Sequence, residues 1–269
     1  MEINNKLKKL QYILEDIGSA VIAFSGGVDS TFLAKTAVDT LKNRVLAVTC
    51  VSAFLSESEK KEARRLAKKI KISHQFVKQR LVPELLNNPK DRCYYCKKEV
   101  FSGLIGIARC KGFSAVIDGS NADDLMDYRP GRKALKELGI RSPLQEVGLT
   151  KKDIRLLSKD MGLDTWNKPA MACLGSRFAY GERITRKKLL MVEKAEEFLR
   201  ALRITQFRVR NHSNLCRIEA GNEDVSIILK DRIRIIKKMK SLGFTYVTID
   251  LEGYRIGSMN EIWGWKRKR

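Results

Sequence analysis

With 269 residues the chain can bury a full core, and no apolar run reaches the roughly 18 residues of a membrane span, so we expect a soluble cytoplasmic protein. Its six cysteines are too few for a disulfide scaffold at this size, which favours metal binding or catalysis in a reducing compartment. The formal net charge of +22 indicates an anionic partner and keeps nucleic acid open, although no zinc finger, KH domain or RNA-recognition motif is recognisable.

The first half of the chain alternates between predicted helices and strands. Apolar residues at helical spacing predict a helix over 3–17, and a short apolar run predicts a buried strand over 20–24. Then follow a helix over 31–38, a strand over 44–50, a helix that begins at a Ser56/Glu59 capping box, and strands over 73–77 and 114–117. This alternation predicts an α/β fold with a doubly wound, mostly parallel sheet, whose ligands bind beyond the carboxyl ends of the strands.

The second half has a different pattern. Helices over 133–138 and 151–161 lead into an irregular stretch over 167–181 that contains Pro and Gly. Beyond it we predict a helix over 185–201, short strands over 206–210 and 215–220, a broken helix over 224–242 and a last strand over 245–249. The sequence therefore predicts two domains, residues 1–168 and a smaller α+β domain over 169–269.

The turn after the first strand has the chemistry of a phosphate site. A strand that turns through Gly26 and Gly27 into a helix leaves backbone N–H groups unpaired at the helix N-terminus, where the helix dipole favours an anion. Ser25 and Ser30 can add hydroxyl donors. The alternative is a tight turn capped by Asp29 or Ser30, with the glycines present for geometry alone. No Walker A spacing is present.

The six residues SGGVDS resemble the pyrophosphate loop of the PP-loop ATP pyrophosphatases, which adenylate a substrate oxygen. The resemblance implies ATP binding by Ser25, Gly26, Gly27, Asp29 and Ser30. Asp29 would be repelled by the phosphates unless the two share a Mg²⁺ ion. The fold implied is of the adenine-nucleotide alpha-hydrolase-like type.

Polar and acidic residues follow the predicted strand over 114–117. The stretch from Asp118 to Gly131 reads DGSNADDLMDYRPG, which as composition alone fits an exposed loop. Next to the SGGVDS turn it predicts a second wall of the site, with Asn121 toward ATP and Arg129 toward an anionic group of the substrate.

Three of the cysteines could hold a metal centre. Cys93 and Cys96 form a C-x-x-C pair, but no second pair or His pair completes a zinc site. With Cys173 they could hold a [4Fe–4S] cluster that leaves one iron open, since four cysteines are the usual complement. Buried inert cysteines are the alternative.

Six stretches together resemble the LarE family, in chain order and over nearly the whole sequence: SGGVDS, DRCYYCKKEVF, DGSNADDLMDYRPGRKAL, RSPL, KPAMACLGSRFAYGERIT and FRVRNHSNLCRIE. The resemblance implies an ATP-dependent sulfur transferase that acts on pyridinium-3,5-biscarboxylic acid mononucleotide, a small nucleotide substrate, in nickel-pincer cofactor biosynthesis. It also implies a homo-oligomer, and a sulfide or other sulfur donor as partner. Cys173 aligns with a cysteine that some members sacrifice as their sulfur source, whereas members that also carry Cys93 and Cys96 resemble iron–sulfur enzymes.

Other roles also follow from the resemblance alone. It assigns the substrate phosphate to Arg208 and Arg210, which alternate along a predicted strand and so share a face. Ser176 and Arg177 would contact the substrate near the sulfur. The resemblance also associates the carboxylates of Glu219, Glu197 and Asp224 with metal.

Two other functions remain open from the sequence. A tRNA thiolase would share the ATP loop and the cysteines, and the charge of +22 suits a polyphosphate. A nucleotide-binding sensor without turnover would need only the ATP site.

Overall fold

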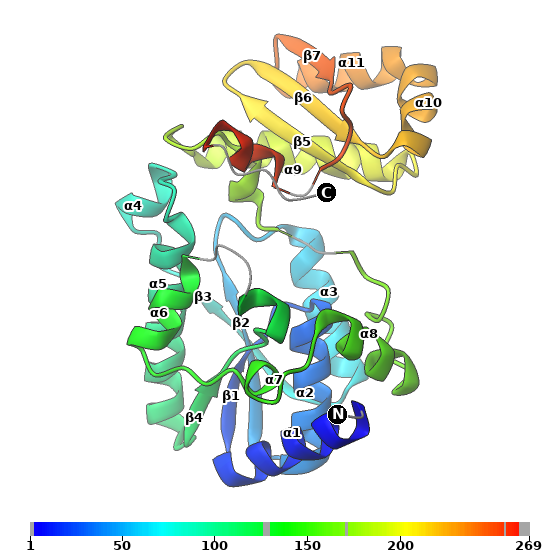
Figure 1. The fold of residues 1–269 in the computed structure, drawn as a ribbon. Helices are drawn as coiled ribbons and strands as arrows, with labels where there is room; N and C mark the ends of the chain where they lie inside the picture. The colour runs from blue at the N-terminus through cyan, green and yellow to red at the C-terminus, as the bar shows by residue number, and fades with distance from the viewer. Residues whose placement is uncertain (1–2, 126–129, 170–171, 256, 264–269) are drawn as a thin grey trace. The chain divides into compact units, whose positions relative to one another are not determined.

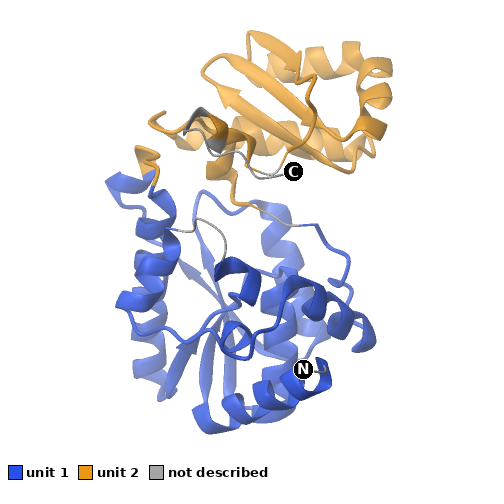
Figure 2. Ribbon diagram, in the orientation of Figure 1, with its two compact units in different colours: residues 1–85, 91–171 blue, residues 86–90, 172–269 orange. Residues whose placement is uncertain are grey.

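The computed structural model describes residues 3–125, 130–169, 172–255 and 257–263. The chain divides into two compact units, Met1–Leu85 with Asp91–Met171, and Leu86–Lys90 with Ala172–Arg269 (Figure 2). The short segment Leu86–Lys90 therefore belongs to the second unit, although the chain on either side of it belongs to the first. In the described ranges no helix is both long and apolar enough to cross a membrane.

A four-stranded parallel sheet forms the centre of the first unit (Figure 1). Its strands are β1 Ala20–Ala23, β2 Val45–Val51, β3 Ser73–Lys78 and β4 Ala115–Ile117, in the order β3-β2-β1-β4. Every pair is parallel, with Ile22 of β1 opposite both Ala47 and Ile117. The predicted parallel sheet is thus confirmed, and the carboxyl ends of β1 and β4 lie at the same edge.

Helices cover both faces of this sheet, as a doubly wound fold requires. The helices of the first unit are α1 Ile3–Ile17, α2 Val28–Leu41, α3 Glu57–Lys69, α4 Pro83–Leu86 (which runs into the second unit), α5 Arg92–Lys111, α6 Gly131–Glu137, α7 Pro143–Glu146 and α8 Lys151–Asp160. Ile22 packs in one apolar core with Phe32 of α2, while its neighbour Val21 packs in another with Phe101 of α5. Successive strand residues point to opposite faces, so β1 is buried on both sides.

The 20-residue helix α5 is absent from the sequence prediction. Phe101, Leu104 and Ala108 recur at helical spacing and are buried in the core, and Gly112 ends the helix in the left-handed conformation. Its first two turns carry the C-x-x-C pair, Cys93 and Cys96.

The second unit is a small α+β domain. Its sheet has the order β5-β6-β7, with strands β5 Phe207–His212, β6 Leu215–Ala220 and β7 Tyr246–Ile249 and helices α9 Arg186–Ala201, α10 Asn222–Lys230 and α11 Arg232–Ser241. β5 and β6 are antiparallel, and β6 and β7 are parallel. Val209 and Ile218, which pair across β5 and β6, are buried, whereas the residues that alternate with them are mostly charged.

Candidate active site

The SGGVDS turn connects β1 to α2, as predicted, and its shape depends on one glycine. Gly26 has φ +68°, and a Cβ there would lie 3.3 Å from the Cα of Ala63 in α3, so a larger residue would be both strained and crowded. The hydroxyl groups of Ser25 and Ser30 lie 3.0 Å apart, and the Ser25 hydroxyl accepts a hydrogen bond from Gly27 N. The loop is thus closed by its own serines.

The N-terminus of α2 is available to an anion. Gly27 is the N-cap, and no side chain caps the helix at this end. The side-chain cap by Asp29 or Ser30 that the alternative prediction includes is therefore not formed. Instead the Ser30 hydroxyl donates to Gly27 O within the loop. The first-turn amides of α2 keep the unpaired character that phosphate binding requires.

Asp29 is a half-buried carboxylate beside this turn and forms an ion pair with Lys151, the first residue of α8. Burial raises the pKa of Asp29, and Lys151 opposes that shift; repulsion from Asp124 raises it further, and Asn121 lowers it. Oδ1 of Asp29 is buried without a hydrogen-bond partner. A carboxylate oxygen left in this state is a ready ligand for a cation.

A second lysine, Lys168, reaches the loop from the segment that follows α8. Its Nζ donates to Gly26 O at 2.8 Å, and burial lowers its pKa. Arg155 holds this segment by donating to the carbonyl oxygens of Trp166 and Lys168 at 2.6 and 2.7 Å. Neither lysine is among the site residues predicted from the sequence. Lys168 lies in the KPAMACLGSR stretch, and Lys151 begins a helix with a Thr150/Asp153 capping box.

The segment after β4, in which the sequence predicts a second wall of the site, lies beside the SGGVDS turn. A Cβ on Gly119 would lie 3.1 Å from Ser30 N, so the backbone after β4 passes very close to the loop. Asn121 is buried and interacts with Asp29. Asp118 accepts hydrogen bonds from the hydroxyl groups of Ser120 and Ser142 and so holds this backbone in place. The predicted Arg129 lies outside the described residues.

Cys93 and Cys96 lie one turn apart at the start of α5, so both thiols are on one side of the helix. Cys93 is exposed and Cys96 half-buried, and Gln79 Nε2 lies 3.5 Å from the Cys96 Sγ. Helix N-termini stabilise thiolates, which are the form that binds metal.

Cys173 belongs to the second unit, immediately before the 3₁₀ turn η2 Leu174–Arg177, and its side chain is exposed. Its carbonyl oxygen accepts hydrogen bonds from Ser176 N, the Ser176 hydroxyl and Arg177 Nη1, at 3.0, 2.9 and 3.1 Å. The backbone of the Cys173 loop, residues 172–177, is therefore well anchored while its thiol faces outward.

Arg177, which the sequence predicts to contact the substrate, points into the second unit. Its guanidinium is buried and forms a two-point ion pair with Glu196 of α9. Its remaining amino group donates to Ala172 O, Cys173 O and the Ser176 hydroxyl. All three guanidinium nitrogens thus bind protein groups, and the arginine holds the backbone of the loop in place.

Arg208 and Arg210 alternate on β5 as predicted but have different surroundings. The Arg210 guanidinium is buried, pairs with Glu219 at 2.7 Å and donates to Ser176 O at 3.0 Å. Arg208 lies over the ring of Tyr254 at 5.1 Å. Burial lowers the pKa of Arg208, and repulsion from Arg177 and Arg210 adds to this effect. A phosphate near Arg208 would relieve that repulsion.

The three carboxylates assigned to metal do not form a metal site in the described part of the chain, where no group of three His, Cys, Asp or Glu side chains could hold an ion. Glu219 is fully buried, and its two oxygens pair with Arg210 and Arg217. Glu197 is an exposed residue of α9. The prediction that these carboxylates bind metal is therefore corrected. Glu219 is paired with arginines, and Glu197 has no other metal-ligating side chains grouped with it among the described residues.

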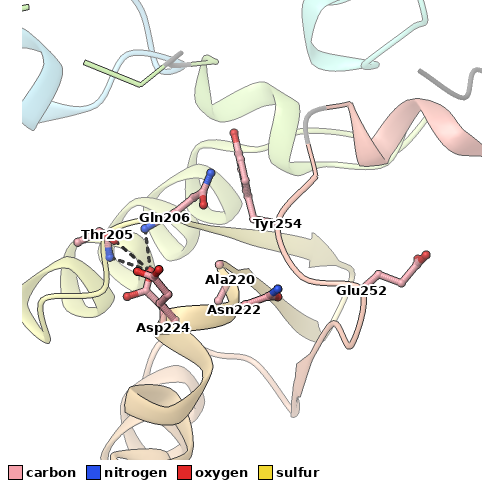
Figure 3. A pocket seen from close by; sticks show the side chains of 9 residues that line it. Thr205, Gln206, Ala220, Asn222, Asp224, Glu252 and Tyr254 are labelled. Atoms are coloured by element: carbon pink, nitrogen blue, oxygen red, sulfur yellow. Dashed lines mark hydrogen bonds between the residues drawn. The ribbon is translucent and has the colours of Figure 1, made fainter. Parts of the chain in front are cut away.

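Asp224 has a structural task as well. It accepts hydrogen bonds from the backbone N–H groups of Thr205 and Gln206, at 3.1 and 2.9 Å, and thereby ties α10 to the start of β5 (Figure 3). These residues line a polar pocket of about 420 Å³ that also includes Glu223 and Glu252. Its acidic lining does not suit a phosphate.

Comparison with known proteins covers both units. A family model described as NAD synthase matches residues 3–88, which include the SGGVDS turn. The chain is 39% identical over 251 residues to the pyridinium-3,5-bisthiocarboxylic acid mononucleotide synthase of Lactiplantibacillus plantarum, covering 92% of this chain and 91% of that protein. The chain belongs to the LarE family.

Two further relatives match over similar lengths. An uncharacterized protein of Synechocystis is 43% identical over 97% of this chain and 98% of its own length. An uncharacterized protein of Methanocaldococcus jannaschii is 34% identical over 87% of this chain and 90% of its own length. This LarE family member is thus an ATP-dependent enzyme, a sulfur-transferring synthase with a PP-loop domain.

Proposed function

We propose that this LarE family member adenylates a carboxylate of pyridinium-3,5-biscarboxylic acid mononucleotide and then replaces AMP with sulfur, in nickel-pincer cofactor biosynthesis. The observation that carries the proposal is the 39% identity to the Lactiplantibacillus plantarum synthase over 92% of the chain, which includes both units. The geometry of the PP-loop supports the adenylation half of the reaction.

In the first half-reaction, a substrate carboxylate oxygen attacks the α-phosphorus of ATP, and the bond to the departing pyrophosphate breaks. The amides at the start of α2 and the hydroxyl groups of Ser25 and Ser30 would bind the β- and γ-phosphates. Lys151 and Lys168, which already reach Asp29 and Gly26, would neutralise the charge on pyrophosphate as it leaves. Asn121 would complete the ATP site from the second wall.

A Mg²⁺ ion fits beside Asp29, because Oδ1 of this half-buried carboxylate is buried without a hydrogen-bond partner. Asp29 would hold the ion, and when bound the ion would neutralise phosphate charge. Lys151 would then be released from its ion pair with Asp29 and could turn to the phosphates.

In the second half-reaction, a sulfur nucleophile attacks the acyl carbon, AMP leaves with the bonding electrons, and a thiocarboxylate forms. We assign the substrate phosphate to Arg208, whose guanidinium lies among other arginines. Arg210 acts behind it, because its charge is already paired with Glu219. Ser176 lies three residues after Cys173 in the same loop, and its hydroxyl group would orient the substrate.

The donor set of Cys93, Cys96 and Cys173 fits a [4Fe–4S] cluster in its chemistry, since three thiols leave one iron without a protein ligand. When bound, such a cluster would supply sulfide for the reaction.

The acceptor distinguishes this proposal from a tRNA thiolase, which the charge of +22 favours. We expect AMP and pyrophosphate to form in the presence of the pyridinium mononucleotide and not in the presence of tRNA alone. The test is anaerobic turnover with each acceptor, followed by mass spectrometry of the product. Thiolated tRNA without any thiocarboxylate would move the assignment to the thiolase. ATP binding without release of AMP or pyrophosphate in the presence of either acceptor would favour a nucleotide sensor.

A further inference from the structure

A buried ion pair between Arg177 and Glu196 adjoins the Cys173 loop. Nε and Nη2 of Arg177 donate to the two carboxylate oxygens of Glu196 at 2.8 and 3.0 Å, and both side chains are more than nine-tenths buried. This two-point geometry fixes the orientation of the guanidinium as well as its distance. Although burial raises the pKa of Glu196, the Arg177 charge and hydrogen bonds outweigh it, so the carboxylate stays ionised.

The pair joins three separate parts of the second unit. Glu196 is carried by α9, and its Oε1 also accepts a hydrogen bond from Val209 N of β5 at 3.2 Å. Arg177 Nη1 reaches the Cys173 loop, where it donates to Ala172 O at 2.6 Å and to Cys173 O at 3.1 Å. The helix and the sheet thereby determine where the backbone of Cys173 lies.

The Cys173 carbonyl oxygen also has donors within the loop. Ser176 N and its hydroxyl already satisfy the Cys173 carbonyl oxygen. A buried ion pair is seldom a strong source of stability, because its desolvation cost is close to its Coulombic gain. What the pair does provide is a single position for a short loop whose thiol is exposed.

We propose that Glu196 is a positioning residue for sulfur transfer, acting through Arg177 to hold the Cys173 loop in one conformation. The proposal rests on the proposed role of Cys173 in that reaction. A displacement of about 1 Å in a reacting group can slow a reaction by about 100-fold. The pair therefore affects the sulfur step and not the adenylation step, whose residues lie in the first unit.

The neighbouring Glu197 offers a matched control. It is exposed on the same helix, so Glu196→Gln and Glu197→Gln are the same chemical change one residue apart. In Glu196→Gln the side chain keeps its size but loses its charge, and its amide group would face the Arg177 guanidinium. Arg177→Lys is a second variant, which keeps the positive charge but cannot bind the carboxylate and the loop carbonyls at once.

The test measures two rates and one chemical reactivity in the full chain. We expect Glu196→Gln and Arg177→Lys to slow thiocarboxylate formation by about 10- to 100-fold while substrate-dependent pyrophosphate release stays within about twofold of wild type. Glu197→Gln should match wild type in both rates. If the wild-type protein forms AMP but transfers no sulfur, that result contradicts the proposed function, whereas the inference about Glu196 is tested by comparing the variants with wild type.

The reactivity measurement does not depend on turnover. In chelator-treated protein, the iodoacetamide labelling rate of Cys173 is compared with that of the exposed Cys110 by mass spectrometry, and buried Cys216 reports unfolding. We expect the Cys173-to-Cys110 ratio to change severalfold in Glu196→Gln and not in Glu197→Gln. An unchanged ratio together with wild-type sulfur transfer in Glu196→Gln would overturn the proposal. So would failure of both Glu196→Gln and Arg177→Lys to fold, because the pair would then serve the fold in general.

Discussion

The PP-loop and the Cys173 loop are both short, polar and functional, but they are shaped in different ways. The PP-loop is closed by residues within it, through the left-handed Gly26 and the contact between Ser25 and Ser30. The Cys173 loop is held by residues distant in sequence, mainly Glu196 through Arg177 and Arg210 through Ser176. The shape of the PP-loop, which would bind phosphate through its backbone, is thus set largely by its own residues. The shape of the Cys173 loop, which presents a thiol, depends on the surrounding domain.

The ion pairs beside the two loops also differ in their burial and in how completely they are hydrogen-bonded. The ion pair of Asp29 and Lys151 is partly exposed, and one Asp29 oxygen lacks a hydrogen-bond partner. In the proposed mechanism these groups would therefore exchange partners on binding ATP and Mg²⁺. The pair of Arg177 and Glu196 is buried and bonded at both carboxylate oxygens. We infer that the first region is built to rearrange and the second to stay fixed.

The largest effect is expected where the PP-loop loses its carboxylate. Asp29→Ala should abolish AMP and pyrophosphate formation, because it removes the proposed Mg²⁺ ligand and leaves Lys151 without its partner. Circular dichroism should show an intact fold, since Lys151 is partly exposed and can be solvated. Asp39→Ala, an exposed aspartate further along α2, is the control and should remain active. AMP release at the wild-type rate in Asp29→Ala would contradict the assignment of the PP-loop.

Replacing cysteines tests whether Cys173 supplies sulfur alone or together with Cys93 and Cys96. If Cys93, Cys96 and Cys173 hold a cluster, changing any one of them to Ala should remove its brown colour and the sulfur transfer together, while adenylation continues. Cys110→Ala and Cys216→Ala are controls. Burial raises the pKa of Cys216 to about 12, so this thiol is unreactive at neutral pH.

A sacrificial cysteine predicts another pattern. Only Cys173 would then be essential, turnover would stop at one sulfur per chain, and the protein would lose the mass of H₂S. Mass spectrometry after the reaction separates the two mechanisms. Dehydroalanine at position 173, with Cys93 and Cys96 dispensable, would contradict the cluster.

The smallest effect concerns the two arginines of β5, which differ in burial and pairing. Arg208→Ala should weaken binding of the mononucleotide by about one to two decades, since a charge-assisted contact contributes roughly 1.5–3 kcal/mol. Arg210→Ala should instead destabilise the second unit, because breaking a buried ion pair costs about 3–5 kcal/mol. Isothermal titration and chemical denaturation measure the two effects. Equal losses of affinity with unchanged stability would mean that both arginines bind the substrate directly.

The amino-acid sequence determined the local features of this protein. Alternating helices and strands predicted the parallel sheet, and SGGVDS predicted the strand, turn and helix of the PP-loop. The Ser56/Glu59 capping box is present as predicted. These features depend on backbone conformation and on contacts within a few residues, which a sequence motif specifies directly.

Only the tertiary structure decided which charged groups meet. It assigned Glu219 to Arg210 and Arg217, brought Lys151 and Lys168 to the PP-loop, and distinguished buried Glu196 from exposed Glu197. Adjacent glutamates on a helix are alike in composition and propensity, and their burial depends on which face packs against the sheet. Ion pairs between residues far apart in sequence form only after that packing has set their distance and removed water from around them.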